Sequence, residues 1–360
     1  MSGRTLIVLG DAVAAFEDDR PHPRRDYAAL AERLDADILD ASVLGRRRGR
    51  FRDGVLLARR AAALAPAYDN VYCDSEHIGL PLAWALRAHR RPRLTMIAHY
   101  LTPAKKALPA RLLRLPRRID AVVLHSPTQA DRARWIGFGT QQAHIVPYQV
   151  DERFWQPSPP SPGSRLIASV GQEFRDYRTL VEAMRGLDAE ADIAAGSYWS
   201  SRARNISDRE LPHNVRMRRR GYDELLALYR ASAFVVVPLH DVDFQAGIIT
   251  ILEAMAMARA VVVSRTRGQT GVISGPLLRD GHPVDIGERA WPADTGVYVT
   301  PGDPAALRAA IERLLADPAA ARRMGEAGRA HVEATFTLDR FVDRLAPIIE
   351  GRAPVAAMTP

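Results

Sequence analysis

The amino-acid sequence predicts an α/β protein with two doubly wound parallel sheets. Short apolar runs alternate with helical patterns along nearly the whole chain, which is typical of parallel sheets covered by helices on both faces. A segment rich in Pro, Ser and Gly, QPSPPSPGS at 156–164, interrupts this alternation near the middle. With 360 residues, the chain is also longer than a single core usually becomes, which favours two domains.

The first half is predicted to form one sheet with its helices. The predicted strands are the apolar runs TLIVLG, ADILD, NVYC, LTMIAH, AVVLHS and AHIVPY. Between them, helical periodicity marks DYAALAERL, GVLLARRAAALA, LPLAWALRA and TQADRARWIGF. We therefore predict a first domain over residues 1–150 and a linker over 151–164.

The second half repeats the pattern. RLIASVG, DIAAGS, VRMRR, FVVVPL, AVVVS and GVYVT are predicted strands, separated by helices such as DYRTLVEAMRGL, YDELLALYRA and GIITILEAMAMA. This predicts a second domain over 165–337, followed over 338–360 by a C-terminal helix that packs back toward the first domain and a flexible tail. We expect a cleft between the domains, with ligands at the carboxyl ends of the strands.

The composition indicates the cellular compartment of the protein and the charge of its partners. No apolar stretch is long enough to span a membrane, the N-terminus reads as a strand rather than a signal peptide, and Cys73 is the only cysteine. These features predict a cytoplasmic protein. Residues 1–150 contain 24 Lys and Arg against 15 Asp and Glu, whereas residues 151–360 contain 26 against 27. The positive excess therefore lies in the first half, which favours an acidic partner.

The stretch DFQAGIITILEAMAMARAVVVS, residues 243–264, is apolar or small almost throughout, and Glu253 stands alone in it. A helix starting near Gly247 would present unpaired N–H groups that suit a diphosphate. Glu253, further along the helix, could then accept bonds from the hydroxyls of a ribose. It could equally cap the helix or pair with an arginine, and spacing alone leaves both readings open.

Several segments resemble, in order, those of family 4 glycosyltransferases, which are retaining enzymes of the GT-B fold. The matching segments are VDERFWQP, VGQEFRDYRTLVEAM, GYDELLALYRASAFVVVPL, LEAMAMARAVVVS and TGVYVTPGDPAALRAAIERLLADPAAARRMGEAGRAHV. The resemblance is continuous over roughly 145–350 and looser before it. It implies a glycosyltransferase, with a hexose as the expected sugar. The sugar would pass from a nucleotide diphosphate sugar to a hydroxyl or amine of a small-molecule, glycan or lipid acceptor.

The resemblance also implies roles for individual residues. Glu253 matches the glutamate that binds the nucleotide ribose, and Arg175 takes the place of a lysine that binds the donor phosphates. Gln245 stands where the family has a second glutamate facing the transferred sugar, so Asp243 could supply the missing carboxylate. The expected catalytic residues are His99, Gln245 and Arg175. The donor would be bound by Arg175, Tyr222, Gln245, Ala246, Gly247, Ile248, Ile249 and Glu253, and the acceptor side would be lined by Gly10, Asp11 and His99.

Other sequence features bear on metal binding, on the acceptor and on alternative functions. Asp241-Val242-Asp243 spells a metal-binding pattern of another glycosyltransferase fold, but the resemblance implies a metal-independent enzyme without a cofactor. The basic first half fits an anionic acceptor, while KKALPARLLRLPRR (105–118) fits either contact with the inner face of a membrane or an ordinary amphipathic surface helix. No nucleic-acid module is recognisable. The alternatives are a nucleotide-sugar epimerase of similar fold and a non-catalytic carbohydrate-binding homologue.

Overall fold

The computed structural model describes residues 3–13, 21–46, 48–89, 92–101, 103–158, 163–195, 211–279, 282–287 and 289–352. The chain forms two compact units. The first contains Met1–Arg20, Arg24–Pro147 and Leu338–Pro360, and the second contains Pro21–Pro23 and Tyr148–Thr337. Part of the expected linker, residues 159–162, lies outside the described residues. No helix in the described ranges is long and apolar enough to cross a membrane.

The first unit is built on a parallel sheet with the strand order β2-β1-β3-β4-β5-β6. Its central strands are apolar and almost fully buried, because helices cover both faces of the sheet. The strands are β1 (Thr5–Val8), β2 (Asp37–Leu39), β3 (Asn70–Cys73), β4 (Arg93–Ile97), β5 (Ala121–Leu124) and β6 (Ala143–Ile145).

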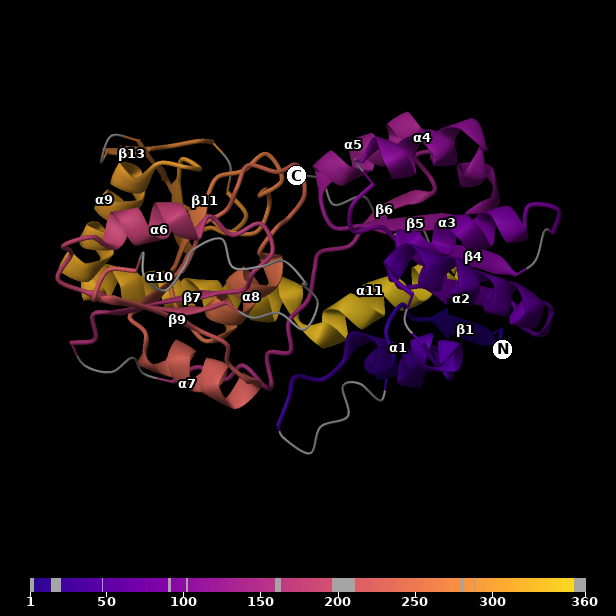
Figure 1. Cartoon of the computed structure of the whole chain (residues 1–360), viewed down its shortest axis with the longest axis horizontal. Coiled ribbons are helices and arrows are strands. Elements are labelled where there is room, and N and C mark those ends of the chain that lie inside the picture. Colours follow the sequence, from indigo (N-terminus) through magenta and orange to yellow (C-terminus); the bar gives the residue numbers. More distant parts are fainter. Residues whose placement is uncertain are drawn as a thin grey trace. The chain divides into compact units, whose positions relative to one another are not determined.

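Two separate cores pack on the two faces of this sheet. One contains residues of α2 (Arg50–Leu64), α3 (Glu76–Ala85), α4 (Ala104–Leu112) and α5 (Pro127–Ile136). The other contains residues of α1 (Asp26–Leu34) and α11 (Leu338–Glu350). Figure 1 shows α11, in yellow, beside the indigo α1. The last helix of the chain therefore completes the layer that covers its first strand.

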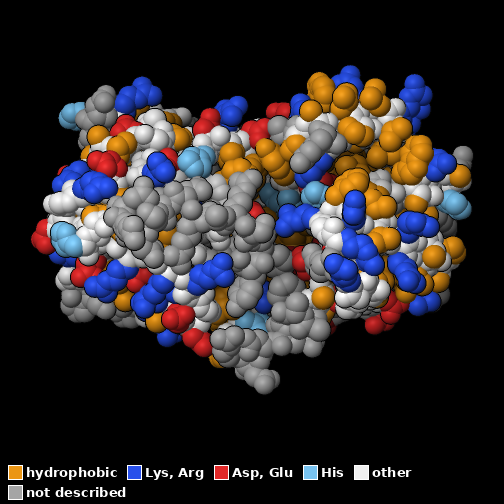
Figure 2. Space-filling model, viewed as in Figure 1, with side chains coloured by type: hydrophobic (Ala, Val, Ile, Leu, Met, Phe, Trp, Pro, Cys, Tyr) orange, Lys and Arg blue, Asp and Glu red, His pale blue; other side chains and the backbone are white. Residues whose placement is uncertain are grey.

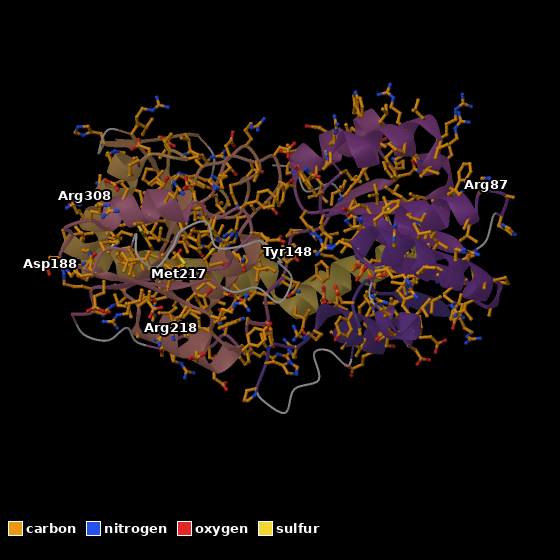
Figure 3. The ribbon with its side chains drawn as sticks, viewed as in Figure 1. Arg87, Tyr148, Asp188, Met217, Arg218 and Arg308 are labelled. Carbon is orange, nitrogen blue, oxygen red and sulfur yellow. The ribbon has the colours of Figure 1, made fainter. Side chains whose placement is uncertain are left out.

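The second unit has an eight-stranded sheet with the order β13-β12-β14-β11-β10-β7-β8-β9. All neighbours are parallel except β12 and β13, an antiparallel pair that the sequence analysis did not predict. At the other edge lies β9, whose Met217 and Arg218 are labelled in Figure 3. The strands are β7 (Leu166–Val170), β8 (Glu190–Ala194), β9 (Val215–Arg218), β10 (Phe234–Val237), β11 (Val261–Ser264), β12 (Leu277–Arg279), β13 (His282–Val284) and β14 (Gly296–Val299).

Helices cover both faces of this sheet as well. Core residues on one face come from α7 (Tyr222–Ala231) and α8 (Ile248–Ala256), and those on the other from α6 (Tyr177–Met184), α9 (Pro304–Ala316) and α10 (Pro318–His331). Helix α8 is buried at every residue except Ile249, as its almost wholly apolar sequence demands. The predicted α/β class with two doubly wound parallel sheets is confirmed.

Helix α10 packs on the end of α8 through a glycine. A Cβ at Gly325 would lie 2.1 Å from the carbonyl oxygen of Ala258, which is backbone and has little freedom to move. We expect Gly325→Ala to lower the free energy of unfolding by about 1–3 kcal/mol, measured by urea denaturation. The exposed neighbour provides the control, because Glu326→Ala should change stability by less than about 0.5 kcal/mol. Equal stability of both variants would contradict this packing.

Candidate active site

The predicted donor-side residues of the second unit follow the carboxyl ends of two neighbouring strands. Arg175 lies in the loop between β7 and α6, and residues 238–247 connect β10 to α8. The two loops are joined by backbone hydrogen bonds from Asp176 to Pro238 (3.0 Å) and from His240 to Phe174 (3.0 Å). This pairing brings residues that are some seventy positions apart to one edge of the sheet.

Arg175 is buried at the junction of the two loops. Its Nε donates to the carbonyl of Val170 (2.9 Å), one terminal nitrogen donates to the carbonyl of Glu173 (3.0 Å), and the other to Oγ1 of Thr250 on α8 (2.9 Å). A guanidinium has five N–H groups, so each terminal nitrogen keeps one more N–H after these bonds. Arg175 therefore fixes the start of α8 against the end of β7 and can still donate to a ligand.

Two glycines make room for this side chain. A Cβ at Gly171 would lie 2.5 Å from one terminal nitrogen of Arg175, and a Cβ at Gly247 would lie 3.2 Å from the other. Both glycines have positive φ, +101° and +77°, which disfavours any other residue. Arg175, Val237 and Leu239 occupy the space that a side chain at Gly247 would fill.

Helix α8 begins at Ile248, one residue after Gly247, as predicted. The N–H groups of its first turn have no acceptor within the helix, and the helix dipole makes this terminus attractive to anions. Ile248 and Ala246 are buried, whereas the side chain of Ile249 is 49% exposed. Because the other residues of α8 are buried, the exposed Ile249 shows which side of the helix a ligand could reach.

Glu253 lies one and a half turns into α8 and is buried, with 8% of its surface exposed. Its partner is neither an arginine nor a helix cap, because Oε2 accepts a hydrogen bond from the hydroxyl of Tyr229 on α7 (2.8 Å). Burial raises the pKa of Glu253 to about 7, although the Tyr229 hydrogen bond and the charge of Arg175 act to lower it. Further hydrogen-bond donors from a ligand would therefore favour ionisation of this carboxyl group.

An aromatic cluster connects Glu253 to Tyr222. Tyr229 packs edge-on against Trp155 (5.4 Å between ring centroids), and Trp155 in turn contacts Tyr222 (6.4 Å) and Phe154 (4.8 Å). Trp155 comes from the VDERFWQP segment and is almost fully buried. Tyr222, at the first position of α7, therefore has a packing role, and the structure places it two rings away from Glu253.

Gln245 is held by the loop that follows β11. Its amide nitrogen donates to the carbonyl of Thr270 (2.9 Å), so the amide oxygen is the atom that could meet a sugar hydroxyl. The same loop supplies Gln269, whose amide nitrogen bonds the carbonyl of Ala246, while its buried Oε1 has no hydrogen-bond partner. The loops 238–247 and 265–272 are thereby tied together beside the start of α8.

The Asp241-Val242-Asp243 pattern is not arranged as a metal site. Asp241 forms an ion pair with Arg267 (3.0 Å), and Asp243 also has a partner within the protein. Within the ranges that the structure describes, no group of three or more His, Cys, Asp or Glu side chains could hold a metal ion.

A hollow of about 250 Å³ lies beside Arg175. It is lined by Arg175, Asp176, Tyr177, Arg178 and His240. Arg178 and His240 are exposed, and His240 lies 3.9 Å from Asp176. The hollow thus collects several groups that can carry positive charge next to the start of α8, and His240 is a member that sequence analysis missed.

In the first unit, the predicted residues Gly10, Asp11 and His99 follow strands β1 and β4. The backbone N–H of Gly10 donates to Oδ2 of Asp74 (2.8 Å), and the His99 ring nitrogen Nε2 lies 3.0 Å from the carbonyl oxygen of Asp74. The exposed His99 ring also stacks on His125 (5.6 Å between ring centroids). Asp74, which follows β3, therefore links Gly10 and His99.

Carboxylates surround His99 at this edge of the first sheet. Glu76 accepts a hydrogen bond from the His99 backbone N–H (3.1 Å) and another from Lys106 (2.5 Å). Oδ1 of Asp74 is buried without a hydrogen-bond partner. Burial raises the pKa of Asp74 to about 7, and the negative charges of Asp11 and Asp26 add to the effect. This edge is more acidic than the net charge of the first half suggested.

Comparison with known proteins agrees with this architecture. Residues 166–317 match the family described as glycosyl transferases group 1. The matched segment covers less than half of the chain and lies within the second unit, which is therefore similar to the members of that family. A comparison with curated protein sequences returned no match at the significance threshold.

Solved structures share the fold of both units. Sucrose-phosphate synthase from Thermosynechococcus elongatus aligns with a TM-score of 0.71 and 20% identity, over 96% of this chain and 98% of its own. A glycosyltransferase from Rickettsia africae aligns at 0.69 with 14% identity, over 98% and 99%. HepE from Anabaena, solved with UDP and glucose, aligns at 0.65 with 14% identity, over 95% and 98%. The chain therefore has the predicted GT-B fold.

Sequence reasoning missed several residues of the site. Tyr229, Thr250 and Gln269 make the contacts that hold Glu253, Arg175 and Ala246, and Asp74 does the same for the acceptor-side residues. Tyr229 and Thr250 lie within segments that the sequence analysis singled out, but no role was predicted for them there, and each of the four residues lies more than twenty positions from its partner. Only Asp74 carried a local signal, because it directly follows a predicted strand.

The raised pKa of Glu253 predicts a pH dependence of stability. Between about pH 4.5 and 7 the unfolded chain releases this proton while the folded chain keeps it, so the free energy of unfolding falls as pH rises. Relative to Glu253→Gln, wild-type stability should drop by up to about 3 kcal/mol across this window and then level off. Urea denaturation at several pH values measures the difference; parallel profiles for the two proteins would contradict the assigned pKa.

Proposed function

We propose that the protein is a retaining glycosyltransferase whose second unit binds a nucleotide diphosphate sugar, with a hexose as the sugar. The observation that carries the proposal is the start of α8. There, unpaired backbone N–H groups, the buried guanidinium of Arg175 and the carboxyl group of Glu253 lie along one short helix. These groups match a diphosphate followed by a ribose.

The diphosphate would bind at the N-terminus of α8. Ile249 and Thr250, in the first turn of the helix, would contribute their backbone N–H groups, whereas the N–H of Ile248 already donates to the carbonyl of Gln245 (3.4 Å). The remaining N–H groups of Arg175 can donate to the phosphate oxygens, and Arg178 and His240 line the adjoining hollow. Positive charge at this position would stabilise the nucleotide diphosphate as it leaves the sugar.

The ribose would bind at Glu253. A carboxylate accepts hydrogen bonds from two neighbouring hydroxyls, and such bonds favour its charged form. Tyr229 holds Oε2 in place, so the carboxyl group is oriented before the ligand arrives. Binding would therefore lower the pKa of Glu253 and release a proton.

Transfer itself needs no nucleophile from the protein in this proposal. The oxygen or nitrogen of the acceptor bonds to the anomeric carbon, the bond from that carbon to the phosphate oxygen breaks, and the acceptor proton passes to the departing phosphate on the same face. Gln245 is neutral and could not form a covalent glycosyl ester, which is consistent with this scheme. Its amide oxygen would accept a hydrogen bond from a hydroxyl of the sugar.

The acceptor is proposed to bind the first unit at the edge formed by Gly10, Asp11 and His99. Asp74 and Glu76 make this edge rich in carboxylates, which favours an acceptor with hydroxyl or amine groups over the anionic acceptor that the charge of the first half suggested. His99 would orient the acceptor or the transferred sugar.

The reaction class can be tested directly. A thermal-shift screen of nucleotide sugars identifies the donor, and mass spectrometry with candidate polyol and amine acceptors identifies the product. The proposal expects a product whose anomeric configuration, read by NMR, equals that of the donor. An inverted product would exclude retention, turnover without acceptor would indicate an epimerase, and tight binding without turnover would indicate a binding protein.

Gln245 should determine the choice of sugar. Gln245→Ala removes the sugar contact and is expected to lower kcat/KM for the donor by roughly tenfold to a hundredfold, the effect of one or two lost hydrogen bonds. Gln245→Glu keeps the size but adds charge, so it should change the order of preference among donors. Thr270 supplies only a carbonyl, and Thr270→Ser is the matched control. If both Gln245 variants keep wild-type activity on every donor, Gln245 has no sugar contact.

A further inference from the structure

A group of large apolar side chains lies exposed on the first unit. Leu108 and Leu112 of α4 are 49% and 71% exposed, Leu113 directly after the helix is 49% exposed, and Trp135 of α5 is 47% exposed. Figure 2 shows hydrophobic side chains gathered over α4 and α5, at the upper right, with Lys and Arg around them. We call Leu108, Leu112, Leu113 and Trp135 the leucine surface.

Helix α4 turns its small residues toward the core and its leucines outward, which is the opposite of an ordinary surface helix. Ala107 and Ala110 face the core with no more than 1% exposed, while Leu108 and Leu112, four positions apart, share the outward face. An amphipathic surface helix would bury its leucines and expose its small residues. The burial pattern of α4 therefore differs from that of an ordinary amphipathic surface helix, which is one of the two readings of residues 105–118, and the exposed leucines need another explanation.

Basic residues surround the leucine surface. Residues 104–118 contain six Lys and Arg and no Asp or Glu, and Arg111, Arg114 and Arg117 are exposed. The guanidinium of Arg111 lies over the ring of Trp135 (4.7 Å), and that of Arg132 lies 4.2 Å from the same ring. The nearby carboxylates Asp120 and Asp131 are each already paired with an arginine.

We propose that the leucine surface docks on an anionic lipid bilayer. Leucines on one face of a basic helix can enter the boundary between headgroups and acyl chains, while the arginines contact lipid phosphates. Tryptophan is the residue that most favours this interfacial depth, and Trp135 stands beside the leucines. The inference concerns a surface of the first unit alone and does not depend on the proposed reaction.

Charge decides against a second copy of this chain as the occupant. A two-fold dimer would bring the same surface of each copy together, and it would place Arg111, Arg114 and Arg117 of one copy against a surface that is equally basic. Such like-charge contacts are unfavourable, whereas an anionic bilayer complements the arginines.

Cosedimentation of the full chain with lipid vesicles tests the proposal. Vesicles of phosphatidylcholine with roughly one third phosphatidylglycerol should bind the protein at low salt, and pure phosphatidylcholine should bind it at least about tenfold more weakly. High salt should release most of the bound protein. Leu112→Asp with Leu113→Asp should abolish binding even at low salt, and Arg114→Glu with Arg117→Glu should weaken it similarly.

The controls distinguish docking through this surface from nonspecific hydrophobic binding and from the effects of misfolding. Phe51 on α2 is 69% exposed, and Phe51→Asp should leave vesicle binding unchanged. Because the substituted leucines are exposed, thermal unfolding and nucleotide binding should match wild type in every variant. No binding to anionic vesicles at low salt would overturn the proposal. So would a dimer in light scattering that the leucine variants dissociate, because a second copy would then cover this surface.

Discussion

The buried guanidinium of Arg175 determines where the groups that we propose to bind the ligand lie in the second unit. It connects the last carbonyl of β7, the loop carbonyl of Glu173 and the hydroxyl of Thr250 on α8. Gly171 and Gly247 are required on either side of it, because a Cβ at either position would press against the guanidinium. This side chain therefore holds the start of α8 against the end of β7.

The binding of a ribose would explain why the carboxyl group of Glu253 is buried in an apolar helix. A lone carboxylate in an apolar helix is unfavourable, and the Tyr229 hydroxyl compensates only in part, because the pKa of Glu253 is still raised to about 7. Further donors would lower this pKa and stabilise the charged form. A ribose next to a diphosphate at the helix start would supply such donors, so the raised pKa of Glu253 and the proposed diphosphate site at the start of α8 fit one ligand.

Much of this could be predicted from the sequence, and the limits have physical causes. Alternating apolar runs predict parallel strands, and the order of the motifs indicates the GT-B fold, so the fold and the position of α8 were predictable. Partners such as Tyr229 and Gln269 were not, because contacts between distant segments leave no periodic signal. The outward leucines of α4 were not predictable either, because periodicity identifies a stripe on a helix but not the direction it faces.

A crystal structure of the complex with a nucleoside diphosphate tests the central claim most directly. The account predicts phosphate oxygens within hydrogen-bond distance of the backbone N–H groups at the start of α8 and of Arg175, with the ribose hydroxyls on Glu253. A diphosphate bound elsewhere on the second unit, or a ribose turned away from Glu253, would contradict it.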